Sequence, residues 1–149
     1  MEHYLDNSAT TRVCREAADK ALYMMTECYG NPSSLHEAGL EAEHMVRRAR
    51  EQVLSALGVR NGAGQIYFTA SGTEANNLAI MGSVFAKERL AGKRIVTTEG
   101  EHSSVEATLR ELEKKGFEVV RIPTKNGVID MDFAGKAIDK NTILVTAMM

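Results

Sequence analysis

The spacing of hydrophobic residues changes near residue 65. Before that point, apolar residues recur at intervals of three and four over residues 16–29 and 34–57, which is the spacing of a helix with one buried face. Gly58 follows directly and is a natural stop for the second helix. The first part of the chain is therefore predicted to contain two helices joined by irregular segments.

Turn and capping residues separate these two helices. The run YGNPSS contains Gly30, Asn31 and Pro32, which all disfavour a continuing helix. Ser34 followed by Glu37 has the spacing of a capping box, so we expect the second helix to begin at Ser34.

From Gln65 onward, short apolar runs alternate with helical patterns. Predicted strands cover residues 65–70, 94–98, 117–123 and 142–149, and predicted helices cover residues 72–90, 103–115 and 132–139. Strands that alternate with helices indicate right-handed crossovers and a parallel sheet buried on both faces. The predicted fold class is α/β, a mostly parallel sheet with flanking helices.

The same change of pattern divides the chain into two expected domains. Residues 1–60 would form an N-terminal arm with helices, and residues 61–149 would form the α/β domain. The last run, TILVTAMM, stays apolar to its end, whereas domains usually end in a polar surface segment. We therefore expect more chain after Met149 in a complete domain of this type.

Composition narrows the classes of function. The chain has 149 residues, of which 26% are charged and 44% hydrophobic, and its net charge is −2. This balance gives no reason to expect a nucleic-acid partner, and no apolar run approaches the ~20 residues that span a bilayer, so no membrane partner is expected. Two cysteines are too few for a disulfide framework and lack metal-ligand spacing. We therefore expect no metal site and a reducing, cytoplasmic location.

A strand-to-helix corner carries the first candidate chemistry. Ser71, Gly72 and Thr73 follow the predicted strand 65–70 and begin a helix. Unpaired N–H groups at a helix start attract phosphate, glycine lets a ligand approach the backbone, and hydroxyl groups can donate hydrogen bonds. The alternative is that Ser71 and Glu74 form a capping box and nothing more. The sequence contains neither a P-loop motif nor a dinucleotide-binding fingerprint.

A histidine follows the next predicted strand. His102 lies in TTEGEHSS, after residues 94–98, so we expect it at the same edge of the sheet as the corner at Gly72. An imidazole there could stack on a flat cofactor or move a proton. The alternative is a histidine near a helix start that has no chemical role.

Several motifs together resemble a known family. The chain contains, in order, YLDNSATT, YGNPSSLHEAG, IYFTASGTEANNLAI, EHSSV and NTILVTAMM. In this order and spacing they resemble the cysteine desulfurases, fold-type I pyridoxal 5′-phosphate (PLP) enzymes of the class V aminotransferase group. The resemblance covers essentially the whole chain. It implies part of a PLP-transferase large domain, preceded by an N-terminal helical segment.

The resemblance implies roles for individual residues. Gly72 and Thr73 match the positions that bind the PLP phosphate, and His102 matches the histidine that stacks on the pyridine ring and takes part in proton transfer. Other residues match segments near the substrate entrance and the dimer interface, and these are Asn7, Ala9, Thr10 and Asn31. Turn and capping chemistry is the alternative reading of the Asn31 loop.

The resemblance also implies that essential groups lie outside these residues. The lysine that anchors PLP, the aspartate that pairs with its ring nitrogen and the catalytic cysteine would all follow Met149. Cys14 and Cys28 do not match that cysteine, and we expect both to be buried, as free cysteines commonly are. The 149-residue chain by itself is therefore expected to be inactive.

The implied function is desulfuration of L-cysteine to L-alanine, with the sulfur transferred to an enzyme cysteine as a persulfide. The implied complete enzyme is a homodimer that supplies sulfur, for example to iron–sulfur cluster assembly, through an acceptor that the sequence does not identify. One alternative is a selenocysteine lyase or another class V aminotransferase. An alternative of another class is a non-catalytic fragment that binds a phosphorylated ligand or interferes with dimers.

Overall fold

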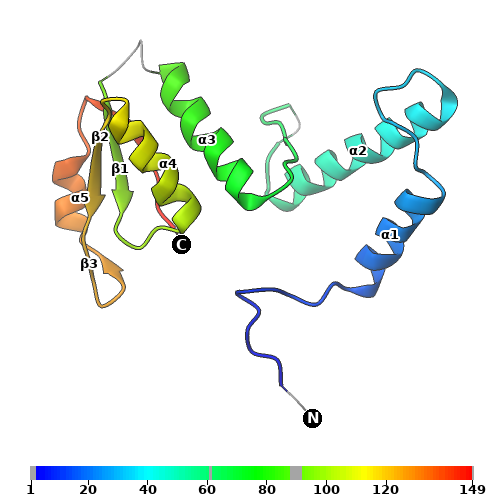
Figure 1. Ribbon diagram of the computed structural model, residues 1–149, viewed down its shortest axis with the longest axis horizontal. Coiled ribbons are helices and arrows are strands. Elements are labelled where there is room, and N and C mark those ends of the chain that lie inside the picture. The colour runs from blue at the N-terminus through cyan, green and yellow to red at the C-terminus, as the bar shows by residue number, and fades with distance from the viewer. Residues whose placement is uncertain (1–2, 61, 88–91, 149) are drawn as a thin grey trace. The chain divides into compact units, whose positions relative to one another are not determined.

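The structure is a computed structural model that describes residues 3–60, 62–87 and 92–148. For Lys87 it describes the backbone but not the side chain. The chain divides into two units, Met1–Tyr67 and Phe68–Met149. The first unit contains helices α1 and α2, and the second contains α3, α4, α5 and the sheet (Figure 1). The expected domains, 1–60 and 61–149, stay a prediction.

The first unit consists of the two expected helices. α1 spans Arg15–Thr26 and α2 spans Glu37–Ala56. Gly58 has a φ of +68° just after α2, as expected of a glycine stop. In the first turn of α2, Gly39 lies so close to the backbone of Asn31 and Ser34 in the preceding loop that a side chain there would overlap the Ser34 carbonyl oxygen.

The capping-box prediction for α2 was wrong. The N-cap is His36, whose Nδ1 accepts a hydrogen bond from the Gly39 N–H at 3.2 Å. Ser34 belongs to the preceding turn, because its N–H donates to the carbonyl oxygen of Asn31 at 2.9 Å. A local turn therefore engages Ser34 before the helix begins.

The two cysteines differ in burial. Cys28 is buried, with 3% of its surface exposed, whereas Cys14 is exposed at the N-cap of α1. The expectation of burial was right for Cys28 and wrong for Cys14. The reason is that α1 buries none of its residues within the described structure.

The second unit is built on a parallel sheet, as predicted. Its strand order is β2–β1–β5, with β1 at Arg94–Thr98, β2 at Glu118–Ile122 and β5 at Thr142–Val145. Both pairings are parallel, so the connections cross over through helices. The crossover helices are α4 (Ser103–Lys114), between β1 and β2, and α5 (Met131–Ala137), between β2 and β5, whereas α3 (Gly72–Lys87) precedes β1. The helix predicted over residues 72–90 corresponds to α3, and its predicted last residues, 88–90, lie outside the described residues.

Core packing explains why β1 is the central strand. Ile95 and Val96 are fully buried on opposite faces of the sheet. Ile95 packs in a cluster with residues of α3 and α4, namely Ile80, Val84, Val105, Leu109 and Leu112. Val96 packs in a second cluster with Ile122, Ala134 and Ala137. Helices therefore cover both faces of β1, which explains its continuous apolar sequence.

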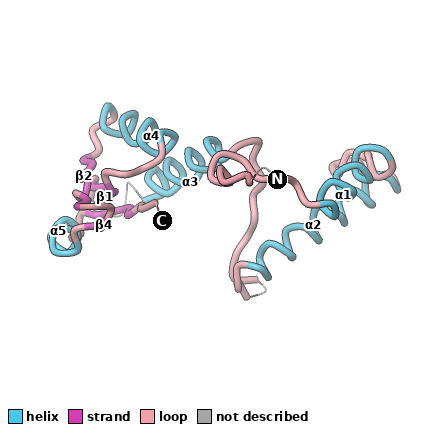
Figure 2. The backbone as a smooth tube through the Cα atoms, turned by 90° about the horizontal axis from the view of Figure 1, so that it is seen from below, coloured by secondary structure: helices cyan, strands magenta, loops and turns pink. Residues whose placement is uncertain are grey.

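The predicted strand over residues 65–70 was wrong. Residues 64–69 have no regular secondary structure, and Figure 2 shows a loop between α2 and α3. Tyr67 and Phe68 are 72% and 56% exposed. A strand needs a hydrogen-bonded neighbour, and no strand within the described residues pairs with this segment.

A short hairpin replaces part of the expected loop after β2. β3 (Thr124–Lys125) pairs antiparallel with β4 (Val128–Ile129). The turn residues Asn126 and Gly127 have φ values of +53° and +78°. Asn-Gly is a strong signal for such a turn, and the sequence analysis missed it.

Within the described part of the chain, no helix combines the length and apolar character that crossing a membrane requires.

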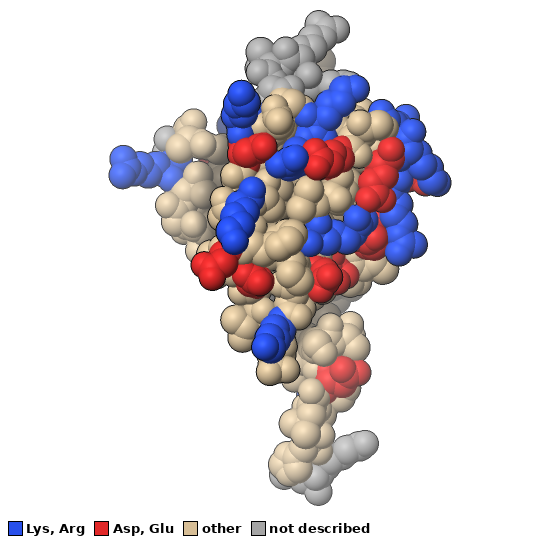
Figure 3. Space-filling view, turned by 90° about the vertical axis from the view of Figure 1, so that its left-hand side faces the viewer, with Lys and Arg blue, Asp and Glu red and all other residues tan. Residues whose placement is uncertain are grey.

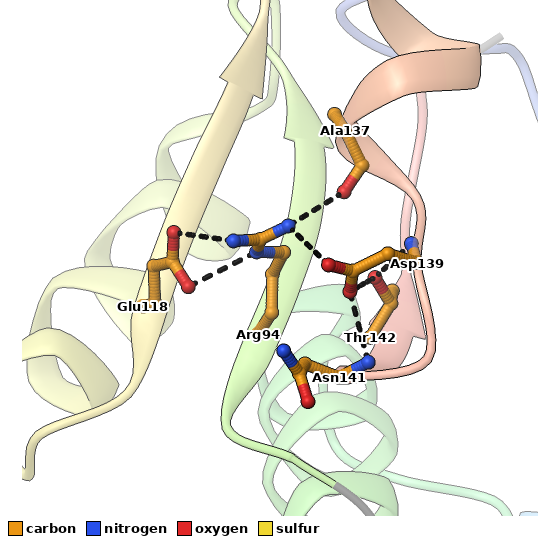
Figure 4. Close-up of polar contacts among 6 residues, drawn as sticks. All are labelled: Arg94, Glu118, Ala137, Asp139, Asn141 and Thr142. Atoms are coloured by element: carbon orange, nitrogen blue, oxygen red, sulfur yellow. Dashed lines mark hydrogen bonds and ion pairs between the residues drawn. The ribbon is translucent and has the colours of Figure 1, made fainter.

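Arg94 links three segments at the start of β1 (Figure 4). Its Nε and Nη2 donate to the two carboxylate oxygens of Glu118 on β2, at 3.0 and 3.1 Å. Its Nη1 donates to Asp139 Oδ2 at 2.9 Å and to the carbonyl oxygen of Ala137 at 3.3 Å. Bidentate pairs of this kind are among the stronger ion pairs, and this side chain is only 22% exposed.

A second ion-pair network holds α4 against β2. Arg121 Nη2 donates to Glu106 Oε1 at 2.9 Å, and Arg121 Nη1 donates to Glu113 Oε1 at 2.8 Å. The hydrogen bond from Arg121 lowers the pKa of Glu106 below its usual range, although partial burial of the carboxylate opposes this. Figure 3 shows acidic and basic side chains interspersed on the face it presents.

We predict that Arg94→Met lowers the free energy of unfolding by about 1–2 kcal/mol, because it removes hydrogen bonds to charged groups and keeps the aliphatic stem. Arg110→Met is the matched control, since Arg110 is 69% exposed and pairs with Glu106 within one helix. Its expected cost is below about 0.5 kcal/mol. Urea denaturation followed by circular dichroism measures both, and equal losses would contradict the role of Arg94.

We also predict that stability falls in acid. Because the folded pKa of Glu106 is lowered, its contribution is complete above the unfolded glutamate pKa of about 4.3 and is lost as the pH falls through the folded pKa. Glu106→Gln and Arg121→Met should each make the free energy of unfolding less dependent on pH below about 5. Denaturation at a series of pH values measures this, and an unchanged slope in both variants would refute it.

Candidate functional site

The corner before α3 contains the capping interactions of the alternative interpretation, in which Ser71 and Glu74 only cap the helix. Ser71 Oγ accepts a hydrogen bond from the Glu74 N–H at 3.2 Å, and Glu74 Oε2 accepts one from the Ala70 N–H at 2.9 Å. The N–H groups of Gly72 and Thr73 have no hydrogen-bond partner within the described residues. Capping therefore leaves two donors of the first turn available.

These two donors are accessible. Gly72 and Thr73 are both exposed, and a Cβ atom placed on Gly72 would meet no atom within 4 Å. Both residues begin a helix of 16 residues, whose N-terminus carries partial positive charge. The corner can therefore receive an anion on its backbone without moving a side chain.

His102 is the N-cap of α4. It follows β1 by a short connection, and its Nδ1 accepts a hydrogen bond from the Ser104 N–H at 3.2 Å. The residue is exposed, so the rest of the ring is open to a ligand. His102 thus has a local structural role, and its exposed ring remains available for chemistry.

Side-chain contacts bring the two predicted corners together. α3 and α4 pack against each other, and Asn76 Nδ2 donates to Ser104 Oγ at 2.8 Å. The Ser104 hydroxyl lies 2.8 Å from His102 Nδ1. Asn76 is one turn after Gly72 and Thr73, so the starts of both helices lie at the same edge of the sheet.

A second pair of contacts supports this arrangement. Thr108 Oγ1 donates to Asn77 Oδ1 at 2.8 Å, and Asn77 Nδ2 donates to the carbonyl oxygen of Thr73 at 2.8 Å. The sequence analysis did not identify the residues of either pair. The available signal was the adjacent Asn76 and Asn77 in an otherwise apolar helix pattern.

Glu101 fixes the loop that carries His102. Its Oε1 accepts hydrogen bonds from Thr98 Oγ1 at the end of β1 and from the Met148 N–H after β5, both at 2.9 Å. The loop after β1 is thereby tied to the segment after β5. Glu101 is a further residue of this edge that sequence reasoning missed.

The residues expected near the substrate entrance lie in the first unit. The Asn31 side chain accepts a hydrogen bond from the Ser33 N–H at 2.9 Å, which is an Asx turn. The Ala9 and Thr10 N–H groups donate to the Asp6 carbonyl oxygen, and the Asn7 carbonyl oxygen accepts from Thr11 Oγ1. All of these contacts are local turn chemistry, and the entrance role stays a prediction.

Among the described residues, no group of three or more His, Cys, Asp or Glu side chains is placed to hold a metal ion.

Comparisons with known proteins agree on one family. The profile of the family described as Aminotransferase class-V matches residues 3–149. A NifS/IcsS protein homolog of Lactobacillus delbrueckii subsp. bulgaricus is 44% identical over 146 residues, which is 97% of this chain and 37% of that protein. The cysteine desulfurase IscS of Methanosarcina thermophila is also 44% identical over 146 residues, 97% of this chain and 35% of that protein.

Solved structures give the same result. A NifS-like protein superimposes with a TM-score of 0.91 at 36% identity, covering 99% of this chain and 40% of that one. The agreement supports the predicted α/β fold as part of a PLP-transferase fold. The chain thus spans well under half the length of these relatives.

Proposed function

The chain belongs to the class-V aminotransferase family, and from that premise we propose that it carries the N-terminal portion of a PLP-dependent cysteine desulfurase. The observation that carries the proposal is the open start of α3, where the free N–H groups of Gly72 and Thr73 share an edge with His102. The Methanosarcina relative bears the name of this activity.

The residues present fit the phosphate of PLP. Two backbone donors, the Thr73 hydroxyl and the partial positive charge of α3 would bind it, and the absent side chain of Gly72 leaves room for it. His102 would contact the ring and hold or move a proton at Nε2, the nitrogen that its cap leaves unengaged. When bound, PLP supplies the electron sink for bond breaking at the α-carbon of an amino acid.

We propose L-cysteine as substrate, with alanine as product and the sulfur passing to an enzyme cysteine. Cys28 is 3% exposed and therefore unsuited to receive sulfur. Cys14 is exposed at the N-cap position of α1, but it matches no catalytic position of the resemblance. The acceptor cysteine and the PLP lysine belong, on this proposal, to the parts of the family fold beyond these residues.

We also propose a homodimer in the cytoplasm. α1 supports a dimer, because it buries no residue and exposes Leu22 and Met25 at 59% and 75%. A second chain would cover this surface. The low cysteine count supports a reducing compartment.

We predict that the chain binds pyridoxine 5′-phosphate at least about tenfold more tightly than pyridoxine, because the phosphate provides the contacts with α3. These ligands lack the aldehyde and cannot react with surface lysines. Thr73→Val should weaken phosphate binding by about tenfold, as expected for a hydrogen bond to a charged group. Isothermal titration calorimetry measures the affinities.

Thr124→Val is the matched control for this experiment, because Thr124 is exposed on β3, far along the chain from α3. It should leave both affinities unchanged. Equal affinities for the two ligands, or equal effects of the two substitutions, would refute the phosphate site.

We predict that residues 3–149, grafted in place of the matched segment of the Methanosarcina enzyme, support alanine formation from L-cysteine. His102→Ala in the graft should lower kcat by about a hundredfold, the scale of a lost acid–base group. The 149-residue polypeptide alone should form no alanine. A graft that folds and binds PLP without forming alanine, or alanine from the polypeptide alone, would contradict the assignment.

A further inference from the structure

Three side chains form a continuous hydrogen-bonded chain between α3 and His102. Asn76 Nδ2 lies 2.8 Å from Ser104 Oγ, which lies 2.8 Å from His102 Nδ1. Ser104 is 7% exposed and Asn76 is half-buried, whereas His102 is exposed. The chain therefore runs from the packed interface of the two helices to a ring at the surface.

The donors and acceptors in this chain have a defined direction. The amide nitrogen of Asn76 can only donate, so Ser104 Oγ accepts from it. The remaining proton of the Ser104 hydroxyl then points at His102 Nδ1, which also accepts the Ser104 backbone N–H at 3.2 Å. Because two donors meet at Nδ1, that atom carries no proton and the neutral ring is protonated at Nε2.

We propose that Asn76 and Ser104 are positioning residues that fix the tautomer and ring orientation of His102. They present the Nε2–H group to whatever ligand occupies the edge of the sheet. Only the catalytic consequence rests on the proposed function, since the tautomer is a property of the free chain. As a consequence, Asn76, one turn into α3, controls which ring nitrogen of His102, the N-cap residue of α4, carries the proton.

The chain contains an internal reference for this effect. His36 also caps a helix, and its Nδ1 accepts the Gly39 N–H at 3.2 Å. Within the described residues no hydroxyl group reaches His36 Nδ1. Both histidines therefore cap a helix through Nδ1, which accepts the N–H of the third residue after His36 and of the second residue after His102. Only His102 also has a hydroxyl group, that of Ser104, at the same nitrogen.

The direction of the hydrogen bonds can be reversed with a single substitution. In Asn76→Asp a carboxylate replaces the amide, and it can only accept. The Ser104 hydroxyl would then donate to residue 76, and its oxygen would accept a proton from His102 Nδ1. The neutral ring should shift from the Nε2–H toward the Nδ1–H tautomer, because the 2.8 Å bond to the hydroxyl oxygen is shorter than the 3.2 Å bond from the Ser104 backbone N–H that it displaces.

The experiment is long-range ¹H–¹⁵N NMR of the ¹⁵N-histidine-labelled full chain, without cofactor, at alkaline pH. The signals of the four histidines are assigned by His102→Gln and His36→Gln. We expect Asn76→Asp to raise the Nδ1–H population of His102 at least severalfold and to leave His36 unchanged. In a Ser104→Ala background the same substitution should have no effect, because the connecting hydroxyl is gone.

Two control variants match these changes. Asn126→Asp makes the same substitution in the β3–β4 turn, and Ser103→Ala removes the neighbouring exposed hydroxyl of α4. Neither should alter the His102 spectrum. If Asn76→Asp fails to fold, Ser104→Ala alone decides, because the nitrogen shifts of His102 should then approach those of His36.

The proposal is overturned if Asn76→Asp leaves the His102 tautomer unchanged, or if it acts equally without the Ser104 hydroxyl. An unchanged His102 spectrum in Ser104→Ala would also overturn it. The cofactor site is tested separately by the binding of pyridoxine 5′-phosphate. Failure of that binding would leave the tautomer result standing, so the two proposals fail independently.

Discussion

The parallel pairing of β1 with both of its neighbours is the constraint on which the candidate site depends. Ile95 and Val96 fill the cores on the two faces of this strand, so neither side chain can move to the other face without emptying a core. Parallel strands need crossover helices, and α4, which connects β1 to β2, begins at the edge where β1 ends. α3 precedes β1 and packs against α4, and the contacts from Asn76 and Asn77 to α4 place the start of α3 at the same edge.

Capping at the starts of α3 and α4 decides which N–H groups and ring nitrogens at that edge remain available to a ligand. Ser71 and Glu74 satisfy donors on either side of Gly72 and Thr73 and leave the N–H groups of those two residues free. The capping interactions and the proposed anion site are thus compatible, because they use different donors of the same turn. At α4 the cap is the imidazole itself, and engagement of Nδ1 directs the other ring nitrogen away from the helix.

The described structure also contains surfaces that its own residues do not cover. Tyr67 and Phe68 are largely exposed in a segment without regular secondary structure, and α1 exposes most of its apolar residues. The relatives are more than twice as long as the matched region. Exposed apolar surface of this kind favours association, which is consistent with the proposed dimer.

The sequence alone determined the α/β alternation, the strand at residues 94–98 and the glycine stops, because they depend on local periodicity and backbone freedom. It also indicated Gly72, Thr73 and His102 as candidate site residues. Only the tertiary structure decided that residues 65–70 form no strand, that His36 rather than Ser34 caps α2, and that Asn76 reaches His102 through Ser104. The physical reason is that strand pairing, competition between turns and hydrogen bonds between helices depend on groups far apart in the chain, and periodicity does not encode their partners.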